Sequence, residues 1–320
     1  MTVSVIMPFL NARSHLGEAI ESVQWQTSDA WELLLVDDGS SDGSRAIAMA
    51  AAEHDARLIV LDSPAARSGA AAARNVGITA STGDAIAFLD ADDVYEADFL
   101  RHRSRALADR PDVALGYGPT LWWHPGTPEL DWTEGMRRVA GKVHEPPSLL
   151  TRAVLLNREH VPCTCSVLIR RSAIEEVGGF DERFYLYEDQ TLWVKLLLRH
   201  KAYVDGFVGA RYRRHATSIT SGTTGTTGSG VYQFDEQADR RSPREHFLDW
   251  VAEYSCAGGA QHPAVARALR LARSRIAPTE PLATTEQLMA RYLQGERFLR
   301  RRVARLRLAA RRANRRVGAC

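Results

Sequence analysis

The sequence has few cysteines and lacks long apolar runs. Its 320 residues contain four cysteines, Cys163, Cys165, Cys256 and Cys320, too few for the disulfide framework of a small secreted protein. The first residues follow a strand pattern and not that of a signal peptide. No apolar run reaches the roughly 18 residues that cross a bilayer. We therefore expect a cytoplasmic protein, with any membrane contact peripheral and at the inner face.

Short apolar strands alternate with helices at the start of the chain. Strands are predicted at 3–7, 33–36, 58–61 and 85–89, and helices at 16–23, 46–50, 70–76 and 99–107. Nearly continuous apolar strands between helices are typical of a mainly parallel sheet covered on both faces. Two further strands are expected at 166–169 and 202–208. The sequence thus predicts an α/β fold with a Rossmann-like central sheet.

The later parts of the chain differ in composition, which suggests three regions. The main domain is expected to span 1–220. Tryptophans and prolines between Trp122 and Pro147 predict either loops that line a ligand groove or a packed aromatic insertion. Residues 221–241 continue a Ser/Thr/Gly-rich tract and predict a flexible loop. Ser242 and Pro243 are a helix N-cap and first-turn pair, so 242–320 are expected to form a helical extension.

Two acidic clusters follow predicted strands, namely Asp37-Asp38 and Asp90-Ala91-Asp92-Asp93. Ligands of open parallel sheets bind beyond the carboxyl ends of the strands, so both clusters are expected to face one crevice. The Asp-Ala-Asp alternation can direct one carboxylate toward a ribose hydroxyl and the other toward a divalent cation on a diphosphate. The alternative is that these aspartates only cap helices or occupy turns.

A third acidic site, Glu188-Asp189, precedes a strongly apolar helix. A carboxylate there could accept the proton of an attacking hydroxyl. Taken alone, such a pair is more often an N-terminal cap that interacts favourably with the helix dipole.

Arg74, Asn75 and His215 are candidates for contacts with phosphate. Arg74 supplies a cation, Asn75 an amide, and His215 a group that binds metal or diphosphate. Singly, Arg74 is as well explained by a salt bridge, and His215 by an ordinary loop position.

The order of these motifs resembles a known family. The chain is similar to glycosyltransferase family 2, whose members have the GT-A fold. The matching segments cover about residues 1 to 220: Val3 to Pro8 with Asn11, Gln26-Thr27, Leu35 to Asp42, Ala73 to Ile78, Gly83-Asp84, Phe88 to Asp93, Gly178 to Glu182, Glu188-Asp189, and Tyr212 to His215 with Ser218.

The resemblance implies roles for particular residues. Asp189 would be the general base, and Asp92 with His215 would hold Mg²⁺ or Mn²⁺ at the diphosphate. The donor site would be formed by Pro8, Asn11, Asp37, Asp38, Arg74, Asn75, Asp90, Ala91 and Glu188. Within this set, Pro8 and Asp38 would hold the base and ribose, and Asp37 would support the turn.

The resemblance also implies a reaction. Members of the family invert the anomeric centre in one displacement, so a sugar would pass from a nucleotide-sugar, in the first place a UDP-sugar, to an acceptor hydroxyl. The acceptor would be a glycan, a lipid-linked sugar or a small molecule, in glycan, cell-surface polysaccharide or glycoconjugate synthesis. The Gln-x-x-Arg-Trp signature of processive synthases is absent from the sequence, so we expect transfer of a single residue.

Two features remain outside this pattern. Cys163 and Cys165 alternate along an apparent strand, and two thiols make an incomplete zinc site, so buried or groove-lining cysteine is expected. Ten arginines lie between Arg297 and Arg316, around an apolar stripe from Leu299 to Val317. That tail would form a helix that lies on an anionic membrane, packs on the domain or forms a dimer seam. No motif that reads nucleic acid accompanies it, so nucleic acid is not an expected partner.

Two other functions compete with transfer. A sugar-1-phosphate nucleotidyltransferase would need a glycine-rich phosphate loop, which Pro8-Phe9-Leu10-Asn11 does not provide. A catalytically silent nucleotide-sugar-binding or scaffold protein, including an arginine-tailed adaptor, is disfavoured because all three acidic sites are present.

Overall fold

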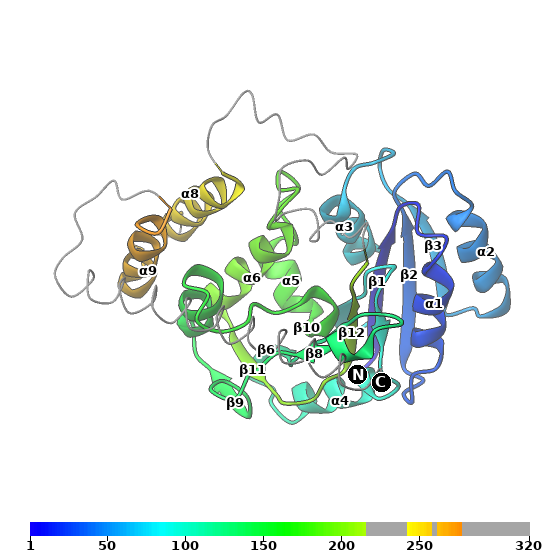
Figure 1. Ribbon diagram of the computed structural model, residues 1–320, viewed down its shortest axis with the longest axis horizontal. Coiled ribbons are helices and arrows are strands. Elements are labelled where there is room, and N and C mark those ends of the chain that lie inside the picture. Colours follow the sequence, from blue (N-terminus) through cyan, green and yellow to red (C-terminus); the bar gives the residue numbers. More distant parts are fainter. Residues whose placement is uncertain (216–241, 258–260, 277–320) are drawn as a thin grey trace, which may run out of the picture.

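An eight-stranded sheet forms the centre of the protein (Figure 1). The computed structural model describes residues 1–215, 242–257 and 261–276. The strand order is β3-β2-β1-β4-β10-β6-β11-β9. In chain order these strands are β1 (Val3–Phe9), β2 (Trp31–Asp37), β3 (Leu58–Asp62), β4 (Ala85–Phe88), β6 (Val113–Tyr117), β9 (Lys142–His144), β10 (Val167–Arg170) and β11 (Lys201–Val204). The first four predicted strands are confirmed and are parallel to one another, whereas β10 is antiparallel to both β4 and β6.

Helices cover both faces of the sheet because alternate residues of each strand point to opposite sides. One face of β1 contributes Val3, Val5 and Met7 to an apolar cluster with α1 (Leu16–Gln24), α2 (Ser44–His54) and α4 (Phe99–Ala108). The other face contributes Ile6 to a cluster with α3 (Ala70–Ala80), α5 (Arg171–Val177) and α6 (Glu188–Arg199). This layering confirms the predicted α/β fold.

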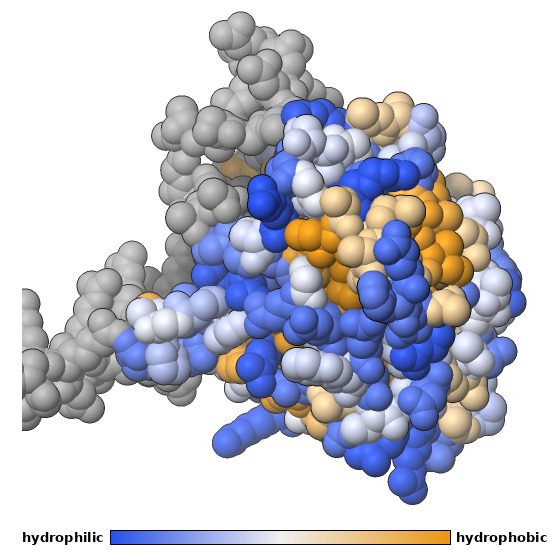
Figure 2. Space-filling view, turned by 90° about the vertical axis from the view of Figure 1, so that its right-hand side faces the viewer, coloured by the Kyte–Doolittle hydropathy of each residue, from blue (hydrophilic) through white to orange (hydrophobic). Residues whose placement is uncertain are grey.

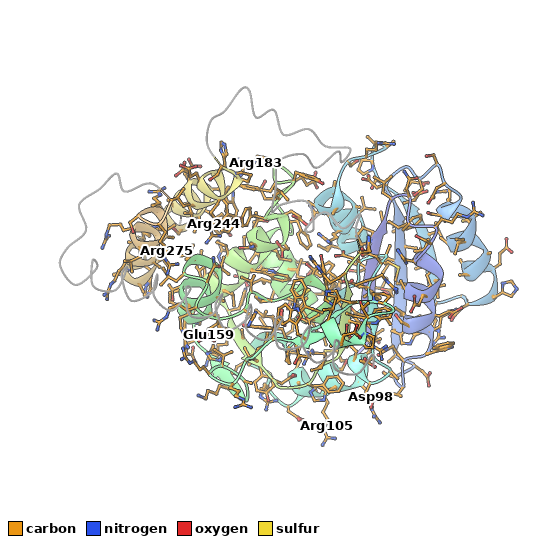
Figure 3. The ribbon with its side chains drawn as sticks, in the orientation of Figure 1. Asp98, Arg105, Glu159, Arg183, Arg244 and Arg275 are labelled. Carbon is orange, nitrogen blue, oxygen red and sulfur yellow. The ribbon has the colours of Figure 1, made fainter. Side chains whose placement is uncertain are left out.

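The C-terminal helices pack against this second cluster. α8 (Pro243–Cys256) begins with the predicted cap, because Ser242 and Glu245 exchange side-chain and backbone hydrogen bonds. α9 (Pro263–Arg273) follows it. Arg244 and Arg275, both labelled in Figure 3, donate to carbonyls at the end of the π-helix η2 (Leu150–Leu155) at 2.7 and 2.8 Å. The expected loop 221–241 and arginine-rich stripe lie outside the described residues, and the division at residue 220 stays a prediction.

A second, four-stranded sheet replaces much of the expected loop region. Its order is β5-β12-β7-β8, formed by β5 (Val94–Tyr95), β12 (Ala210–Arg213), β7 (Leu121–Trp123) and β8 (Trp132–Thr133). The short helix η1 (Pro128–Leu130) joins β7 to β8. Trp122 and Trp132 stack at 5.0 Å across these two strands. The packed aromatic insertion, one of the two alternatives, therefore describes this part of the chain.

Two sequence predictions on strands are wrong. Cys163 and Cys165 do not alternate along a strand, because Thr164–Ser166 form the short helix η3, which brings the two sulfurs to 3.4 Å. The strand expected at 202–208 ends at Val204, because Asp205 turns the chain by accepting the backbone N–H of Phe207 at 2.8 Å.

Among the helices of the described residues, none combines the length and apolar character needed to cross a membrane. Figure 2 shows the side of the molecule that carries α2 and the edge strand β3, where apolar side chains gather within a largely hydrophilic surface. Met49 and Ile59 are the most exposed large apolar residues of these two elements.

Candidate active site

The loops after β1 and β2 are held together by the predicted donor residues. Asp37 accepts the backbone N–H of Ser40 at 2.8 Å, which gives Asp37 the expected turn-supporting contact. Asn11 has a positive φ of 51° and accepts the N–H of Ser41 at 2.8 Å. Pro8 pairs in register with Val36 beside this turn. These three contacts fix the edge of the sheet where a donor nucleotide is expected to bind.

Asp38 connects this edge to α3. Its buried carboxylate accepts the backbone N–H groups of Ser68 at 2.8 Å and Gly69 at 2.9 Å, directly before the helix begins. Gly69 has a φ of +94°, a conformation that favours glycine. Asp38 therefore orients the loop that leads into the helix carrying Arg74.

Arg74 brings two acidic motifs into contact. Its guanidinium is buried and forms ion pairs with Asp90 at 2.7 Å and with Glu188 at 3.2 Å. Asp90 follows β4 and Glu188 begins α6, so the ion pairs join segments about a hundred residues apart in the chain. Within the part of the chain that the structure describes, the buried Nε of Arg74 has no hydrogen-bond partner. Ala91 is buried beside Asp90.

Asp189, the predicted base, lies next to this ion-pair network. Burial and, to a smaller extent, the neighbouring Glu188 carboxylate raise the pKa of Asp189 to about 7, while Arg74 opposes both effects. A carboxylate with a pKa near neutrality can accept a proton efficiently at physiological pH. The Asp189 Oδ1 accepts the backbone N–H of Gln190 at 2.7 Å, which sets the orientation of the group at the first turn of α6.

Asp92 and His215 form the second corner of the site. The His215 Nε2 lies 2.9 Å from the Asp92 Oδ2, and both side chains are partly exposed, at 24% and 34%. Within the described residues, His, Cys, Asp and Glu side chains form no cluster of three or more that could hold a metal. Carboxylate oxygen and imidazole nitrogen are suitable ligands for Mn²⁺, and a diphosphate supplies further oxygens. The pair therefore fits a metal that protein and donor hold together.

Arg213 holds Asp92 and Asp93 in place, a role that was not predicted from the sequence. It donates to the Asp92 carbonyl at 2.6 Å and to Glu18 at 2.6 Å, while its backbone N–H donates to Asp93 at 2.9 Å. Burial raises the pKa of Asp93 well above its usual range, and Asp92 adds to the effect. The only sequence signal for Arg213 was its place in the run Tyr212 to His215.

His15 is a second residue that was not predicted. Its ring lies 5.2 Å from that of His215, centre to centre. Burial lowers the pKa of His15, and the nearby Arg213 and His215 lower it further. These effects favour the neutral form of the His15 imidazole beside His215.

Asn75 has a different role from the phosphate contact that we expected. Its amide nitrogen donates to Glu182 at 2.7 Å and to the Phe180 carbonyl at 3.1 Å, and its oxygen accepts the Phe180 N–H at 2.9 Å. All three contacts fix the segment between α5 and α6. Asn75 thus positions the acidic start of α6, and both N–H groups of its amide are already used.

Comparisons with known proteins identify the family to which the chain belongs. The family model described as glycosyl transferase family 2 matches residues 4–178, more than half of the chain. TuaG of Bacillus subtilis, whose name assigns it to teichuronic acid biosynthesis, is 32% identical over 68% of this chain and 81% of its own length. The Escherichia coli glucosyltransferase WfgD is 31% identical over 68% of this chain and 79% of its length; its name gives UDP-Glc and α-D-GlcNAc-diphosphoundecaprenol as substrates.

Solved structures show the same fold. Residues 1–349 of TarS from S. aureus, in complex with UDP-GlcNAc, superpose with a TM-score of 0.66 at 16% identity, covering 92% of this chain and 80% of that one. The mannosyltransferase PcManGT from Pyrobaculum calidifontis, with GDP-Man and Mn²⁺, gives a TM-score of 0.52 at 17% identity over 91% and 84% of the two chains. The protein therefore has the GT-A fold, belongs to glycosyl transferase family 2 and is a glycosyltransferase.

Proposed function

We propose that this glycosyltransferase transfers one sugar from a UDP-sugar to an acceptor hydroxyl, with inversion, during synthesis of a cell-surface polysaccharide. The names of TuaG and WfgD, which refer to a teichuronic acid and to a lipid-linked sugar acceptor, support the pathway class. The UDP-GlcNAc complex of TarS supports the donor class. A lipid-linked acceptor also agrees with the membrane contact predicted for the arginine-rich tail, which lies outside the described residues.

The observation that carries this proposal is the double ion pair of Arg74. One guanidinium forms ion pairs with Asp90, which is proposed to contact the donor, at 2.7 Å and with Glu188, which precedes the proposed base, at 3.2 Å. Asp189 follows Glu188 directly, so the proposed proton acceptor is held close to Asp90, which follows β4. Transfer needs this proximity, because the acceptor oxygen must reach the sugar carbon while the base takes its proton.

In the proposed reaction the acceptor oxygen forms a bond to the anomeric carbon as the bond from that carbon to the diphosphate oxygen breaks. Asp189 accepts the hydroxyl proton, and the bonding electron pair leaves with the nucleoside diphosphate. Asp92 and His215 would hold Mg²⁺ or Mn²⁺, which supplies positive charge for the departing diphosphate. Arg74 orients Glu188 and opposes the rise in the Asp189 pKa.

Hydrolysis or transfer of a UDP-sugar, assayed with and without Mn²⁺, tests the proposal. We expect Asp92→Asn to lower the metal-dependent rate by about 10²-fold or more, because a group that stabilises developing charge contributes on this scale. Asp112→Asn is the matched control, since this exposed carboxylate pairs with Lys201 at the other end of the sheet. A metal-independent rate that survives Asp92→Asn would refute the metal assignment, and inactivity of the wild type toward every nucleotide-sugar would refute transfer.

A further inference from the structure

Trp193 lies one helical turn after the proposed base. It follows Asp189 by four residues on α6, so the two side chains lie on the same face of the helix. Long side chains of helical residues point back toward the helix N-terminus, which directs the indole toward the turn that carries Asp189. Trp193 is completely buried and belongs to the apolar cluster that α6 shares with α3 and α5. The packed interior therefore fixes this indole beside the first turn of α6.

The indole N–H of Trp193 is a polar group in an apolar setting. Its Nε1 is buried and completes no hydrogen bond within the part of the chain that the structure describes. A buried donor without a partner destabilises a fold, and a phenylalanine at this position would not carry that cost. Burial and then Glu188 raise the pKa of Asp189, and the side chain of Trp193 is one of the groups that lower it. The indole N–H thus interacts with the Asp189 carboxyl group without closing a hydrogen bond to it.

Asp189 shares its nearest cation with two other acids. Glu188 on the same helix and Arg74 on α3 are the charged groups that act on Asp189 most strongly. Arg74 forms ion pairs with Glu188 and with Asp90, which follows β4. Its guanidinium also opposes the rise in the Asp189 pKa that burial and Glu188 cause. One guanidinium therefore serves three carboxyl groups from three parts of the chain.

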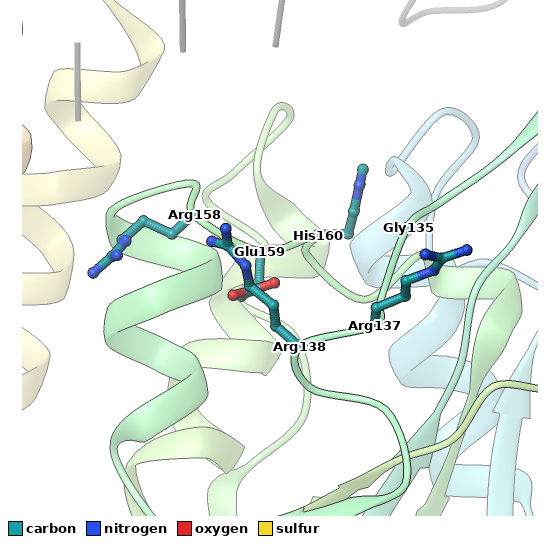
Figure 4. Close-up of a pocket in the computed structure, with 6 residues that line it drawn as sticks. All are labelled: Gly135, Arg137, Arg138, Arg158, Glu159 and His160. Carbon is teal, nitrogen blue, oxygen red and sulfur yellow. The ribbon is translucent and has the colours of Figure 1, made fainter. Parts of the chain in front are cut away.

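A buried carboxylate elsewhere in the protein shows the difference. Glu159 forms an ion pair with Arg152 at 2.7 Å, and Figure 4 shows it among Arg137, Arg138 and Arg158, which line the same cavity. Glu159 thus has a guanidinium of its own, whereas Asp189 shares Arg74. A neutral donor beside Asp189 adds support for its charged form to that of the Gln190 backbone N–H.

We propose that Trp193 is a positioning residue for the base, and that its indole N–H binds and stabilises the carboxylate form of Asp189. When Asp189 loses its proton, the negative charge attracts the N–H, which then forms a charge-assisted hydrogen bond. On protonation this bond is lost again, so the indole favours the form of Asp189 that can accept a proton. This inference rests on the proposed function, in which Asp189 is the base, and adds to it a residue that keeps the base ionised.

Direct titration of Asp189 tests the inference without turnover. The full chain is labelled with ¹³C at the aspartate carboxyl carbons and followed by NMR across neutral pH, and Asp189→Asn identifies the Asp189 signal. We expect Trp193→Phe to raise the pKa of Asp189 by about one pH unit, because the variant removes a donor that favours the charged form. Replacement of Trp193 by 3-benzothienylalanine, in which sulfur takes the place of the N–H, keeps the size of the indole and should raise the pKa equally.

Trp31→Phe is the matched control. Trp31 is also buried, and its Nε1 likewise completes no hydrogen bond to the described residues. It begins β2, whereas Asp37 of the proposed site ends that strand. Trp31→Phe therefore removes the same chemical group far from Asp189 and should leave the titration of Asp189 unchanged.

The pH dependence of turnover supplies a second readout. In Trp193→Phe the rise of kcat/KM with pH should move up by about one pH unit, so that kcat/KM falls about tenfold at pH 6 and stays within about twofold of the wild type at pH 9. A loss that came only from a weakened fold would be similar at both pH values. Thermal unfolding of each variant shows that the protein compared is folded.

An unchanged Asp189 pKa in the benzothienylalanine protein, or an equal rise in Trp31→Phe, would overturn the inference. The proposed function fails by a different result, namely wild-type kcat/KM in Asp189→Asn. In that case Asp189 is not the base, while the NMR titration still decides whether Trp193 stabilises its carboxylate.

Discussion

Arg74 is a buried cation whose charge is compensated by carboxylates from two distant motifs. A charge removed from water is tolerated only when it is paired and hydrogen-bonded, and here the partners are Asp90 and Glu188. The same guanidinium opposes the two effects that raise the pKa of Asp189, namely burial and the charge of Glu188. The electrostatic state of the proposed base therefore depends on an ion pair that also joins it to the donor side.

The pH dependence of turnover should reveal this arrangement. Since Asp189 must be ionised to accept a proton and its pKa is raised to about 7, kcat/KM should rise about tenfold per pH unit below pH 7 and level off above it. Asp189→Asn should lower kcat by roughly 10²- to 10⁴-fold. Arg74→Gln should move the midpoint of any residual activity to higher pH. A flat profile between pH 5.5 and 8.5 would show that Asp189 is not the base.

Which of these contacts could be predicted depended on whether a residue sits in a recognisable pattern. The aspartates at the ends of β2 and β4 belong to such a pattern, because two acidic clusters follow successive apolar strands whose carboxyl ends meet at one edge of the sheet. The contacts of Arg213 and His15 could not be predicted, since Arg213 reaches Glu18 across 195 positions of the chain and His15 meets His215 only through the fold. Asn75 had the right motif, but its hydrogen bonds inside the protein could not be read from spacing.

The segment between α5 and α6 is held by backbone geometry as well as by Asn75. Gly178 and Gly179 both have positive φ, 77° and 67°. A Cβ at Gly178 would meet nothing within 4 Å, whereas one at Gly179 would lie 2.6 Å from the Asn75 Oδ1. Because Gly179 precedes Phe180, whose backbone Asn75 binds, this glycine permits the close approach of α3 to the segment that leads to Asp189.

The two glycines therefore form a matched pair. Gly178→Ala should cost about 1 kcal/mol, the usual penalty of a left-handed backbone for alanine, and Gly179→Ala should cost about 1 to 3 kcal/mol more, because overpacking adds to it. In an Asn75→Ala background the clash is gone, so the difference between the glycine variants should shrink below about 1 kcal/mol. Denaturant unfolding of the set measures this coupling. Equal costs at Gly178 and Gly179 in the wild-type background would contradict the proposed contact.

Elements with strong local patterns were predictable, and those made by distant pairing were not. The strands at 3–7, 33–36, 58–61 and 85–89 are apolar runs between turn residues, and each is present. The second sheet depends on strands as short as Val94–Tyr95, which pairs with Ala210–Arg213, and two residues have no measurable periodicity. The antiparallel direction of β10 follows from packing on two neighbours, which sequence periodicity does not encode.

The residues of the proposed site come from several elements in and around the central sheet. The donor-side residues come from the parallel strands β1, β2 and β4, while Asp189 comes from α6, whose apolar face shares a core with α8 and α9. In Figure 1 these parts extend from the blue strands to the yellow and orange helices. The sequence order of the motifs identified the family, but the packing of α8 on α6 and of α9 on α8 and η2 could not be inferred, because any amphipathic helix pair could cover that face.

A donor that contacts both the strands and α6 should stabilise the entire folded chain. The metal should add to this stability only when the donor is also bound. Asp92 and His215 supply only two ligands, so we expect Mn²⁺ alone to change Tm by less than about 1 °C. UDP with Mn²⁺ should raise Tm by roughly 3 to 6 °C at a hundredfold excess of ligand over Kd, because mass action then contributes about 2.7 kcal/mol to the free energy of unfolding. His215→Gln should reduce this joint effect while leaving the smaller effect of UDP alone, because the imidazole lies 2.9 Å from Asp92, the other proposed metal ligand. Scanning calorimetry of wild type, His215→Gln and Asp112→Asn with each ligand separately and combined measures the synergy. If Mn²⁺ alone stabilised the protein as strongly as the pair, the metal would have a complete protein site of its own, and shared coordination with the diphosphate would be wrong.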